Sequence, residues 1–219
     1  MIAFGAKVAK WPIPSVFFHF LPLKCVFSEN SCIFVPLIGS NNEMKDRLAY
    51  LWVWLRRIGN CRGFGIQSPA DYAFVRYVVN EHWPYYQYRE LAEDDDWLTQ
   101  RLGRLYFRLA NWRQPATVIS NGYRKYWQAG CHRTQVVADA SRVELAHVCV
   151  GERCRTQLEH IYNKVDDRSV LVIEGISRDR GLWQQVVADP RTGVAFDLYY
   201  CGIVMFDKKR TKQNYIINF

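Results

Sequence analysis

The sequence predicts an α/β protein: a mostly parallel sheet with antiparallel strands at its C-terminal end, preceded by an N-terminal helical section. Three observations predict it. Residues 44–115 place apolar side chains at helical spacings of three and four. Residues 116–194 alternate short apolar runs with helical segments, which is typical of strand–helix–strand units. The closing strands are joined by turns too short to connect parallel neighbours.

Composition and charge place the chain in a broad class. It has 219 residues, 49% of them hydrophobic and 23% charged, which indicates a globular protein and excludes a disordered, collagenous or coiled-coil one. The formal net charge of +8 favours an anionic partner and leaves nucleic acid open as one. The cysteines after residue 43 form an odd set without a CxxC pair, which favours reduced thiols and a cytoplasmic location.

Residues 1–43 do not follow the pattern of the rest. The apolar stretch 11–23 contains three prolines and is shorter than the ~20 residues of a membrane span, so none is expected. Residues 33–38 are consistent with one strand without an obvious partner, and Pro36 would confine it to a sheet edge. Three interpretations stay open: a dispensable extension ahead of a start at Met44, an extension that docks on the rest, or a secretory signal without a cleavage site.

The helical section, residues 44–115, begins with an amphipathic helix that ends near Gly59. Its apolar face is formed by Leu48, Leu51, Trp52, Leu55 and Ile58. In the segment 62–71, Ser68 is the predicted N-cap of the next helix, Pro69 suits its first turn and Asp71 would close a capping box.

A further helix is predicted after the acidic run 93–96, which suits the positive end of a helix dipole. Its apolar stripe runs from Leu98 to Trp112. Arg101, Arg104 and Arg108 line up along another face of the same helix. A solvated face is the simpler interpretation of this row, and a surface that binds phosphate or an acidic protein is the alternative.

The α/β section, residues 116–219, is expected to pack with the helical section as one domain. The run 169–173 is so apolar that it should be a central strand. Residues 207–212 are predicted to be an exposed turn that joins the last two strands. The predicted strands lie at 116–120, 134–138, 143–150, 169–173, 194–200, 202–206 and 215–219, and the helices end near 129, 165 and 188.

Both ends of this region carry a resemblance. Residues 62–69, Arg-Gly-Phe-Gly-Ile-Gln-Ser-Pro, resemble the Gly-x-Gly-Ile-x-Ser-Pro segment of a bacterial family described as class I S-adenosylmethionine-dependent methyltransferases. In that family a helix and a Tyr-Tyr segment follow, here Tyr85-Tyr86. Residues 196–206 and 212–216 are similar to the closing strands of the family. The resemblance implies a Rossmann-like sheet with a late antiparallel strand, and S-adenosylmethionine as the cofactor.

The cofactor site departs from the family pattern. The resemblance implies a glycine-rich turn after the first strand, where Asn121 and Gly122 supply a single glycine. It also implies an acid after the second strand that binds ribose; Asp139 occupies that place, although a cap or turn role is the ordinary one. The span from the first strand to Ser169 is about 50 residues, which is short when each strand–helix–strand unit takes ~30. We therefore expect a trimmed half with an eroded pocket for S-adenosylmethionine.

Two further groups of side chains bear on chemistry. Glu174, at the end of a later strand, is a candidate general base, with a solvated loop carboxylate as the plainer alternative. His147, Cys149, Cys154 and His160 resemble metal ligands, and alternation places His147 and Cys149 on one face of a strand. Cys154 and His160 point to different sides of their helix, so buried thiols are expected and no metal site.

The sequence therefore leaves three functions open. The first is a methyltransferase-like protein with a degenerate S-adenosylmethionine site and no catalysis. The second is an active S-adenosylmethionine-dependent methyltransferase with an unknown acceptor. The third is a basic module that binds an anionic partner.

Overall fold

The computed structural model describes residues 23–28, 31–36, 41–60, 63, 65–91, 93 and 95–219, with side chains from residue 47 onward. The chain divides into two compact units, Met1–Trp52 and Val53–Phe219. The division falls within the first helix, α1 (Asn41–Arg56). Residues 1–22, which include most of the apolar stretch considered as a signal, lie outside the described residues.

The first unit contains a small antiparallel sheet. Strand β1 (Leu23–Ser28) pairs with β2 (Ser31–Pro36) over their whole length. The strand predicted at 33–38 therefore exists in shifted form, but the prediction that it has no partner was wrong. Pro36 is the last residue of β2, where a missing N–H costs the ladder least.

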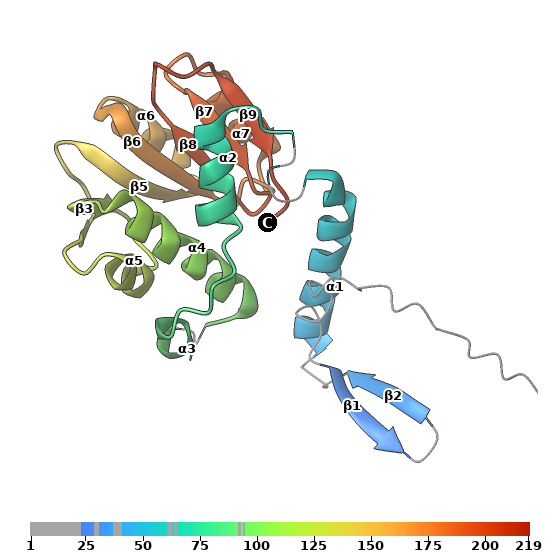
Figure 1. Ribbon diagram of the computed structural model, residues 1–219. Helices are drawn as coiled ribbons and strands as arrows, with labels where there is room; N and C mark the ends of the chain where they lie inside the picture. The colour runs from blue at the N-terminus through green and yellow to red at the C-terminus, as the bar shows by residue number, and fades with distance from the viewer. Residues whose placement is uncertain are drawn as a thin grey trace, which may run out of the picture. The chain divides into compact units, whose positions relative to one another are not determined.

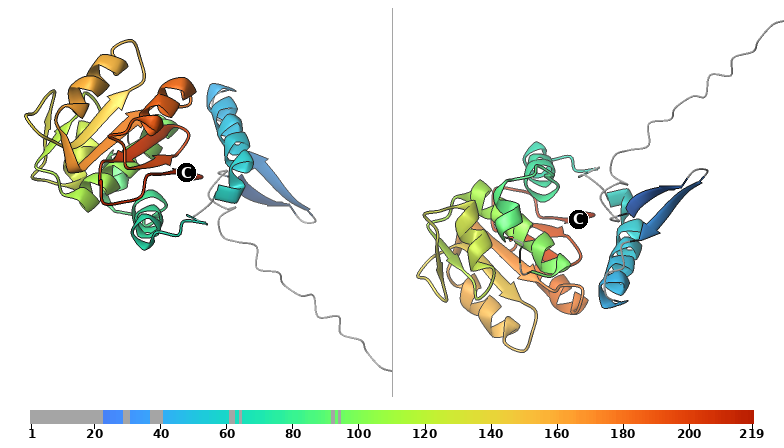
Figure 2. Two further views of the ribbon diagram at one scale, coloured as in Figure 1. Left: turned by 90° about the horizontal axis from the view of Figure 1, so that it is seen from above. Right: turned by 90° about the horizontal axis from the view of Figure 1, so that it is seen from below.

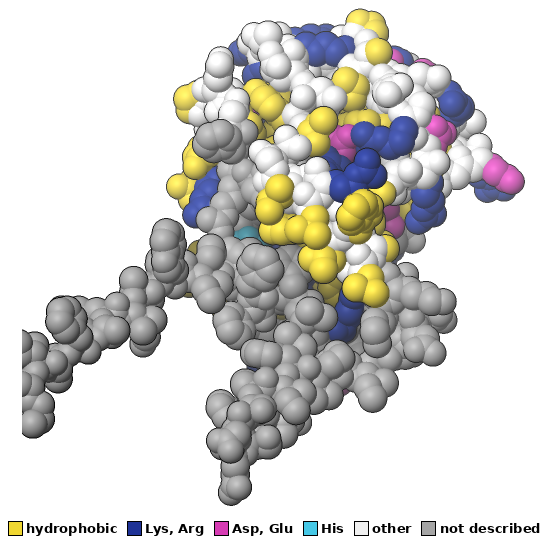
Figure 3. All heavy atoms as spheres, turned by 90° about the vertical axis from the view of Figure 1, so that its right-hand side faces the viewer, with side chains coloured by type: hydrophobic (Ala, Val, Ile, Leu, Met, Phe, Trp, Pro, Cys, Tyr) yellow, Lys and Arg dark blue, Asp and Glu magenta, His cyan; other side chains and the backbone are white. Residues whose placement is uncertain are grey.

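The amphipathic helix predicted before Gly59 is α1, followed by a short 3₁₀ turn (Ile58–Asn60). Three side chains of the predicted apolar stripe have large exposed fractions: 59% for Leu48, 63% for Trp52 and, in the 3₁₀ turn, 53% for Ile58. Hydrophobic side chains also gather on the surface seen in Figure 3. Helical spacing predicted the stripe correctly, whereas its exposure could not be predicted because it depends on what the helix meets.

Among the described residues, the second unit is built on a seven-stranded sheet with the order β4-β3-β5-β6-β8-β7-β9 (Figure 1). Strands β4, β3, β5 and β6 pair in parallel, and β8 lies antiparallel between β6 and β7. This confirms the predicted α/β fold, with a mostly parallel sheet and a late antiparallel strand. The strands are β3 (Thr117–Ile119), β4 (Gln135–Val137), β5 (Val143–Cys149), β6 (Val165–Glu174), β7 (Val194–Asp197), β8 (Cys201–Met205) and β9 (Gln213–Ile216).

The pairing of the last strand differs from the prediction. Residues 207–212 were expected to join two adjacent antiparallel strands, but β9 pairs in parallel with β7. Both edges of β8 are already used, one by β6 and the other by β7. The last strand can therefore add only at the outer edge of β7, which a local turn pattern does not reveal.

Helices cover both faces of the sheet (Figure 2). Alternate residues of β6 enter different cores: Val170 and Val172 pack in one, Leu171 and Ile173 in the other. The first core includes the helices α2 (Pro69–Phe74), α4 (Trp97–Arg113) and α5 (Arg124–Gly130), with a π-helical turn (Val75–Val79). The second core includes α6 (Cys154–Tyr162) and α7 (Arg180–Ala188); the short α3 (Gln87–Leu91) lies on the chain before α4.

Helix α2 starts at the predicted N-cap, and α4 starts directly after the acidic run, as predicted. The Ser68 hydroxyl accepts a hydrogen bond from the Asp71 N–H at 3.3 Å and so caps α2. Asp96, at the end of the predicted acidic run, caps α4 through the N–H groups of its first turn. The Asp71 carboxylate has a long-range role instead of a local one, because it accepts from Arg210 at 2.7 Å and from the Tyr215 hydroxyl at 3.3 Å.

The connection from β4 to β5 is short. Residues 138–142 join these two strands without a helix, whereas α5 connects β3 to β4 and α6 connects β5 to β6. Because β4 and β5 lie on opposite sides of β3, their carboxyl ends surround the end of β3. This arrangement positions the candidate site. Nowhere in the described residues is there a helix with both the length and the apolar character to cross a membrane.

Candidate functional site

A pocket of about 290 Å³ lies at the carboxyl ends of β3, β4 and β5. The strand order reverses at this point, since β4 and β5 flank β3 on opposite sides. Open α/β sheets bind ligands at such a switch point, outside the carboxyl ends of the strands. Polar groups that line the pocket come from the loops after the strands, from β5 and from α6: Ser120, Asn121, Asp139, His147, Cys149, Gln157 and His160.

Three predicted cofactor-binding residues, Asn121, Gly122 and Asp139, come together at this pocket. A Cβ added to Gly122 would meet nothing within 4 Å, and its backbone is not in the left-handed region. Neither the turn nor its surroundings therefore require glycine at this position.

The next residue, Tyr123, carries the unusual backbone of the turn. Its φ is +58°, a left-handed conformation that is rare for a bulky residue and marks a constrained site. Its ring contacts those of Tyr106 and His147, with centroids 4.7 Å and 5.5 Å away. The turn thus directs a tyrosine inward where the family resemblance implied a glycine-rich turn.

The Asp139 carboxylate follows β4 and is already paired. Lys164 Nζ lies 2.7 and 2.8 Å from its two oxygens, and His160 Nε2 lies 3.1 Å from one of them. The hydrogen bond from Lys164 is the main reason that the pKa of Asp139 falls to about 2. This side chain therefore stays ionised near neutral pH, exposed at the rim of the pocket.

Glu174, the candidate general base, lies beside the pocket in a hydrogen-bonded group. Its Oε2 accepts from the Tyr106 hydroxyl at 2.8 Å and lies 3.1 Å from His147 Nε2, while its Oε1 accepts from the Tyr123 hydroxyl at 3.3 Å. Burial raises the pKa of Glu174, but hydrogen bonds from His147, Tyr106 and Tyr123 outweigh it and leave that pKa below its ordinary value. Glu174 is therefore an ionised acceptor and a poor proton donor near neutral pH.

His147 connects Glu174 to the turn after β3. It is buried, and its Nδ1 lies 3.0 Å from the Ser120 hydroxyl oxygen. That hydroxyl lies 2.8 Å from the Gly122 carbonyl oxygen and accepts from the Gly122 N–H at 3.1 Å. A continuous chain of hydrogen bonds thus runs from the pocket turn through His147 to Glu174.

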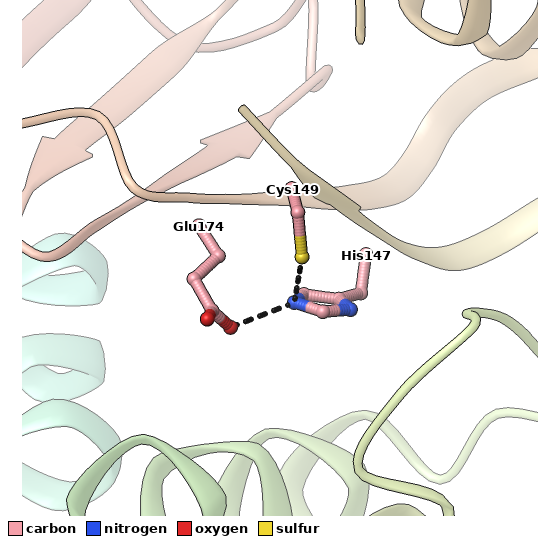
Figure 4. A group of neighbouring side chains, drawn as sticks. All are labelled: His147, Cys149 and Glu174. Atoms are coloured by element: carbon pink, nitrogen blue, oxygen red, sulfur yellow. Dashed lines mark hydrogen bonds and ion pairs between the residues drawn. The ribbon is translucent and has the colours of Figure 1, made fainter. Parts of the chain in front are cut away.

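Cys149 is the next residue on the same face of β5. Its Sγ lies 3.9 Å from His147 Nε2 (Figure 4). The residue as a whole is exposed, but protein atoms packed around the sulfur desolvate it. This desolvation, with the nearby Glu174 charge, raises the pKa of the Cys149 thiol to about 11, so the thiol is protonated near neutral pH. The Nε2, Sγ and carboxylate oxygen of His147, Cys149 and Glu174 lie within 4.8 Å of one another.

The other two members of the predicted metal-like cluster are elsewhere. Cys154 is buried in the core on the α6 side, and the His160 ring contacts Asp139. The expectation that His147 and Cys149 share a strand face agrees with the structure. The third member of their group, Glu174, was predicted only as a candidate base.

The row of arginines on α4 is not a common binding surface. Arg108 is buried, and its guanidinium donates to the carbonyl oxygens of Val78 at 2.6 Å and Val79 at 2.9 Å. Arg104 lies over the Tyr88 ring at 5.3 Å, and Arg101 over the Phe219 ring at 4.7 Å. The prediction of a shared solvated face was wrong for Arg108, because the π-helical turn offers carbonyls that a helical wheel cannot show.

A pair of substitutions on α4 tests this difference. Arg108→Met is expected to lower the free energy of unfolding by about 2–3 kcal/mol, because it leaves buried carbonyls without a charged donor. Arg104→Met, on the exposed side of the same helix, should change it by less than about 1 kcal/mol. Urea denaturation followed by circular dichroism measures both. Equal effects of the two variants would contradict the structural role of Arg108.

Sequence reasoning missed Ser120, Tyr106 and Tyr123 as parts of the site. Tyr106 is one of the most deeply buried side chains, and its spacing marked it only as a helix residue. The position of Ser120 directly after a strand was a usable signal, since the carboxyl ends of neighbouring parallel strands meet. Burial raises the pKa of both tyrosines well above the ordinary value, so they act as neutral hydrogen-bond donors.

The chain was also compared with known proteins. No family model matches it, no curated protein matches it, and no solved structure matches it.

Proposed function

We propose that this chain is a methyltransferase-like protein that binds an adenosine-bearing ligand, S-adenosylmethionine being the expected one, in a degenerate site without efficient methyl transfer. The observation that carries the proposal is the pocket at the strand switch point. Asn121, Gly122 and Asp139 line that pocket, at the places where the family resemblance puts cofactor-binding residues.

The sheet supports the family part of the proposal. The resemblance implies a late antiparallel strand, and β8 runs antiparallel between β6 and β7. The direct link from β4 to β5 at residues 138–142 accounts for the short first half, since one strand–helix unit fewer fits there.

Three features favour a degenerate site over a fully active one. The turn after β3 has one glycine, and the following Tyr123 is packed inward. Asp139 already pairs with Lys164, so a ribose must compete with that ion pair. The pocket volume of about 290 Å³ is at the low end of the ~300–1,000 Å³ of small-molecule sites. This volume suits a nucleoside better than a whole cofactor together with a methyl acceptor.

The location that we propose is the cytoplasm. All four cysteines whose thiols the structure describes, Cys131, Cys149, Cys154 and Cys201, are free. A reducing compartment preserves such thiols.

Calorimetry on the full chain with S-adenosylmethionine, S-adenosylhomocysteine and adenosine tests the proposal. We expect micromolar binding of at least one of these ligands. Asp139→Ala should weaken it at least tenfold, because the variant removes the proposed acceptor for the ribose hydroxyls. Asp166→Ala is the matched control: it also removes a salt-bridged aspartate, here one that pairs with Arg142, but at the amino end of β6 and away from the pocket.

Two results would contradict the proposal. One is the absence of both heat and a thermal shift at millimolar ligand, since a ligand at a hundred times its Kd stabilises the fold by ~2.7 kcal/mol. The other is unchanged affinity in Asp139→Ala. Rapid formation of S-adenosylhomocysteine in the presence of a cell lysate would instead favour the active methyltransferase.

A further inference from the structure

The side chains of His147, Cys149 and Glu174 converge from two neighbouring strands. Residues 147 and 149 of β5 are two apart, so their side chains share one face of the sheet. Cys149 is directly opposite Glu174 in the parallel pairing of β5 with β6. Figure 4 shows the three polar ends pointing toward one another, with His147 Nε2 between the other two.

The hydrogen bonds around Ser120 fit either neutral form of His147. The Gly122 carbonyl accepts from the Trp127 Nε1–H at 3.2 Å, so the Ser120 hydroxyl proton can face either that carbonyl or His147 Nδ1. The Gly122 N–H donates to the hydroxyl oxygen at 3.1 Å. When the hydroxyl turns to the carbonyl, Nδ1 carries the ring proton and donates it to Ser120.

The two forms differ at the other ring nitrogen, which lies 3.1 Å from the Glu174 carboxylate. With its proton on Nε2, His147 donates to Glu174. With the proton on Nδ1, Nε2 offers a lone pair beside the carboxylate, and a metal ion between the two satisfies both. The second form is the one that binds a metal ion, and the contacts of Ser120 accommodate it.

We propose that His147, Cys149 and Glu174 form a three-ligand site for a divalent transition-metal ion of the zinc type. The imidazole nitrogen, the thiolate and the carboxylate are all zinc ligands, and three protein ligands with an open fourth position are typical of non-structural zinc sites. A tetrahedral ion with bonds of about 2.0–2.3 Å places such donors about 3.3–3.6 Å apart. The distances of 3.1 Å from Nε2 to Oε2 and 3.9 Å from Nε2 to Sγ differ from these values by only a few tenths of an ångström. The Sγ and the Glu174 carboxylate oxygen lie within 4.8 Å of each other, and metal binding draws them together.

Charge and protons balance in this site. The dication displaces the Cys149 proton to solvent, and the thiolate and the Glu174 carboxylate then neutralise its two charges. His147 binds through Nε2 as the neutral ring with its proton on Nδ1. Cys149 is exposed and lines the pocket with His147, so the ion has a path from solvent.

The groups around the three ligands are those that a metal site needs. The Ser120 hydroxyl oxygen lies 3.0 Å from Nδ1, where it can accept the ring proton and hold the ring in the tautomer that binds metal. The hydroxyls of Tyr106 and Tyr123 donate to Glu174 and orient its carboxylate. Neither these contacts nor the three ligands depend on an adenosyl ligand, so this inference is independent of the proposed function.

Titration of zinc into the reduced full chain, in competition with a chromogenic chelator, tests the site. We expect one zinc ion per chain and at least a hundredfold weaker binding in Cys149→Ala and in Glu174→Gln. Ser120→Ala should weaken binding about tenfold, as loss of a partner that orients a ligand does. Cobalt provides a second readout, because a thiolate-to-cobalt charge-transfer band should appear in the native protein and vanish in Cys149→Ala.

Cys154→Ala and Asp139→Ala are the controls. Cys154 is a neighbouring thiol outside the group, and Asp139 belongs to the proposed ribose site, so both variants should bind zinc as the native chain does. Since Cys149 is exposed, its replacement should leave the thermal melt of the metal-free chain unchanged. Absence of zinc binding at 100 times the protein concentration, or binding retained by Cys149→Ala, would overturn the proposal.

Discussion

Replacing Gly130 by alanine is expected to lower the free energy of unfolding by about 3 kcal/mol, because the substitution overpacks the contact between α4 and α5. A Cβ at this position would lie 2.2 Å from the backbone carbonyl oxygen of Phe107 and 2.9 Å from the Ala110 Cβ. A backbone atom in the middle of α4 cannot move aside as the end of a flexible side chain can. The two helices would have to separate at the point where α5 returns toward β4.

Gly151→Ala is the matched control for Gly130→Ala. A Cβ at Gly151 would meet nothing within 4 Å, and its backbone is not in the left-handed region. Its substitution should be neutral or stabilise the fold by up to about 1 kcal/mol, since alanine reduces the entropy of the unfolded chain. Urea denaturation gives both values. Similar stabilities of the two variants would show that α4 and α5 are not held at the distance described.

Gly130 shows which features of the fold can be predicted from the sequence and which cannot. The helix that ends at this glycine was predicted from its spacing and its neighbours. That spacing could not distinguish a glycine that ends a helix from one on which another helix rests. The caps Ser68 and Asp96 were predictable because a cap involves residues three positions away. The burial of Arg108 was not, because its carbonyl partners belong to a π-helical turn about 30 residues earlier.

In the candidate site too, residues placed by local pattern could be predicted, and contacts between distant parts of the chain could not. Asn121, Gly122 and Asp139 were predicted together because parallel strands bring their carboxyl ends to one edge. The group around Glu174 needed more than strand ends: the register of β5 with β6, and the direction of Tyr106 from α4. The local sequence pattern specifies neither the strand register nor the direction of that side chain. The partner of β9 was missed for a related reason: β8 pairs with both β6 and β7, and this pairing depends on residues far apart in the sequence.

The ion pairs of Asp197 make the loss of this side chain strongly destabilising. Asp197 ends β7 and is only 2% exposed, and its Oδ1 accepts from Arg57 at 3.1 and 3.2 Å. The Tyr199 N–H donates to the same Oδ1 at 2.9 Å, and the other oxygen, Oδ2, binds Arg180. Asp197→Ala should lower the free energy of unfolding by about 3–5 kcal/mol, because it leaves the nearly buried Arg57 cation without its counter-ion. Glu159→Gln, which breaks the exposed pair with Arg191, should cost less than about 1 kcal/mol.

The pH dependence of stability separates this charge effect from packing. Burial raises the pKa of Asp197, but Arg180, Arg57 and the Tyr199 N–H outweigh it and leave the pKa below its ordinary value. A carboxyl with a lowered pKa in the folded state adds stability above its unfolded pKa of about 3.9, and that stability is lost as the pH falls toward the folded value. Unfolding of the native chain and of Asp197→Asn should therefore differ by a constant amount above about pH 5 and converge below about pH 4. A difference that stays constant down to pH 3 would mean that Asp197 acts through its shape and hydrogen bonds instead of its charge.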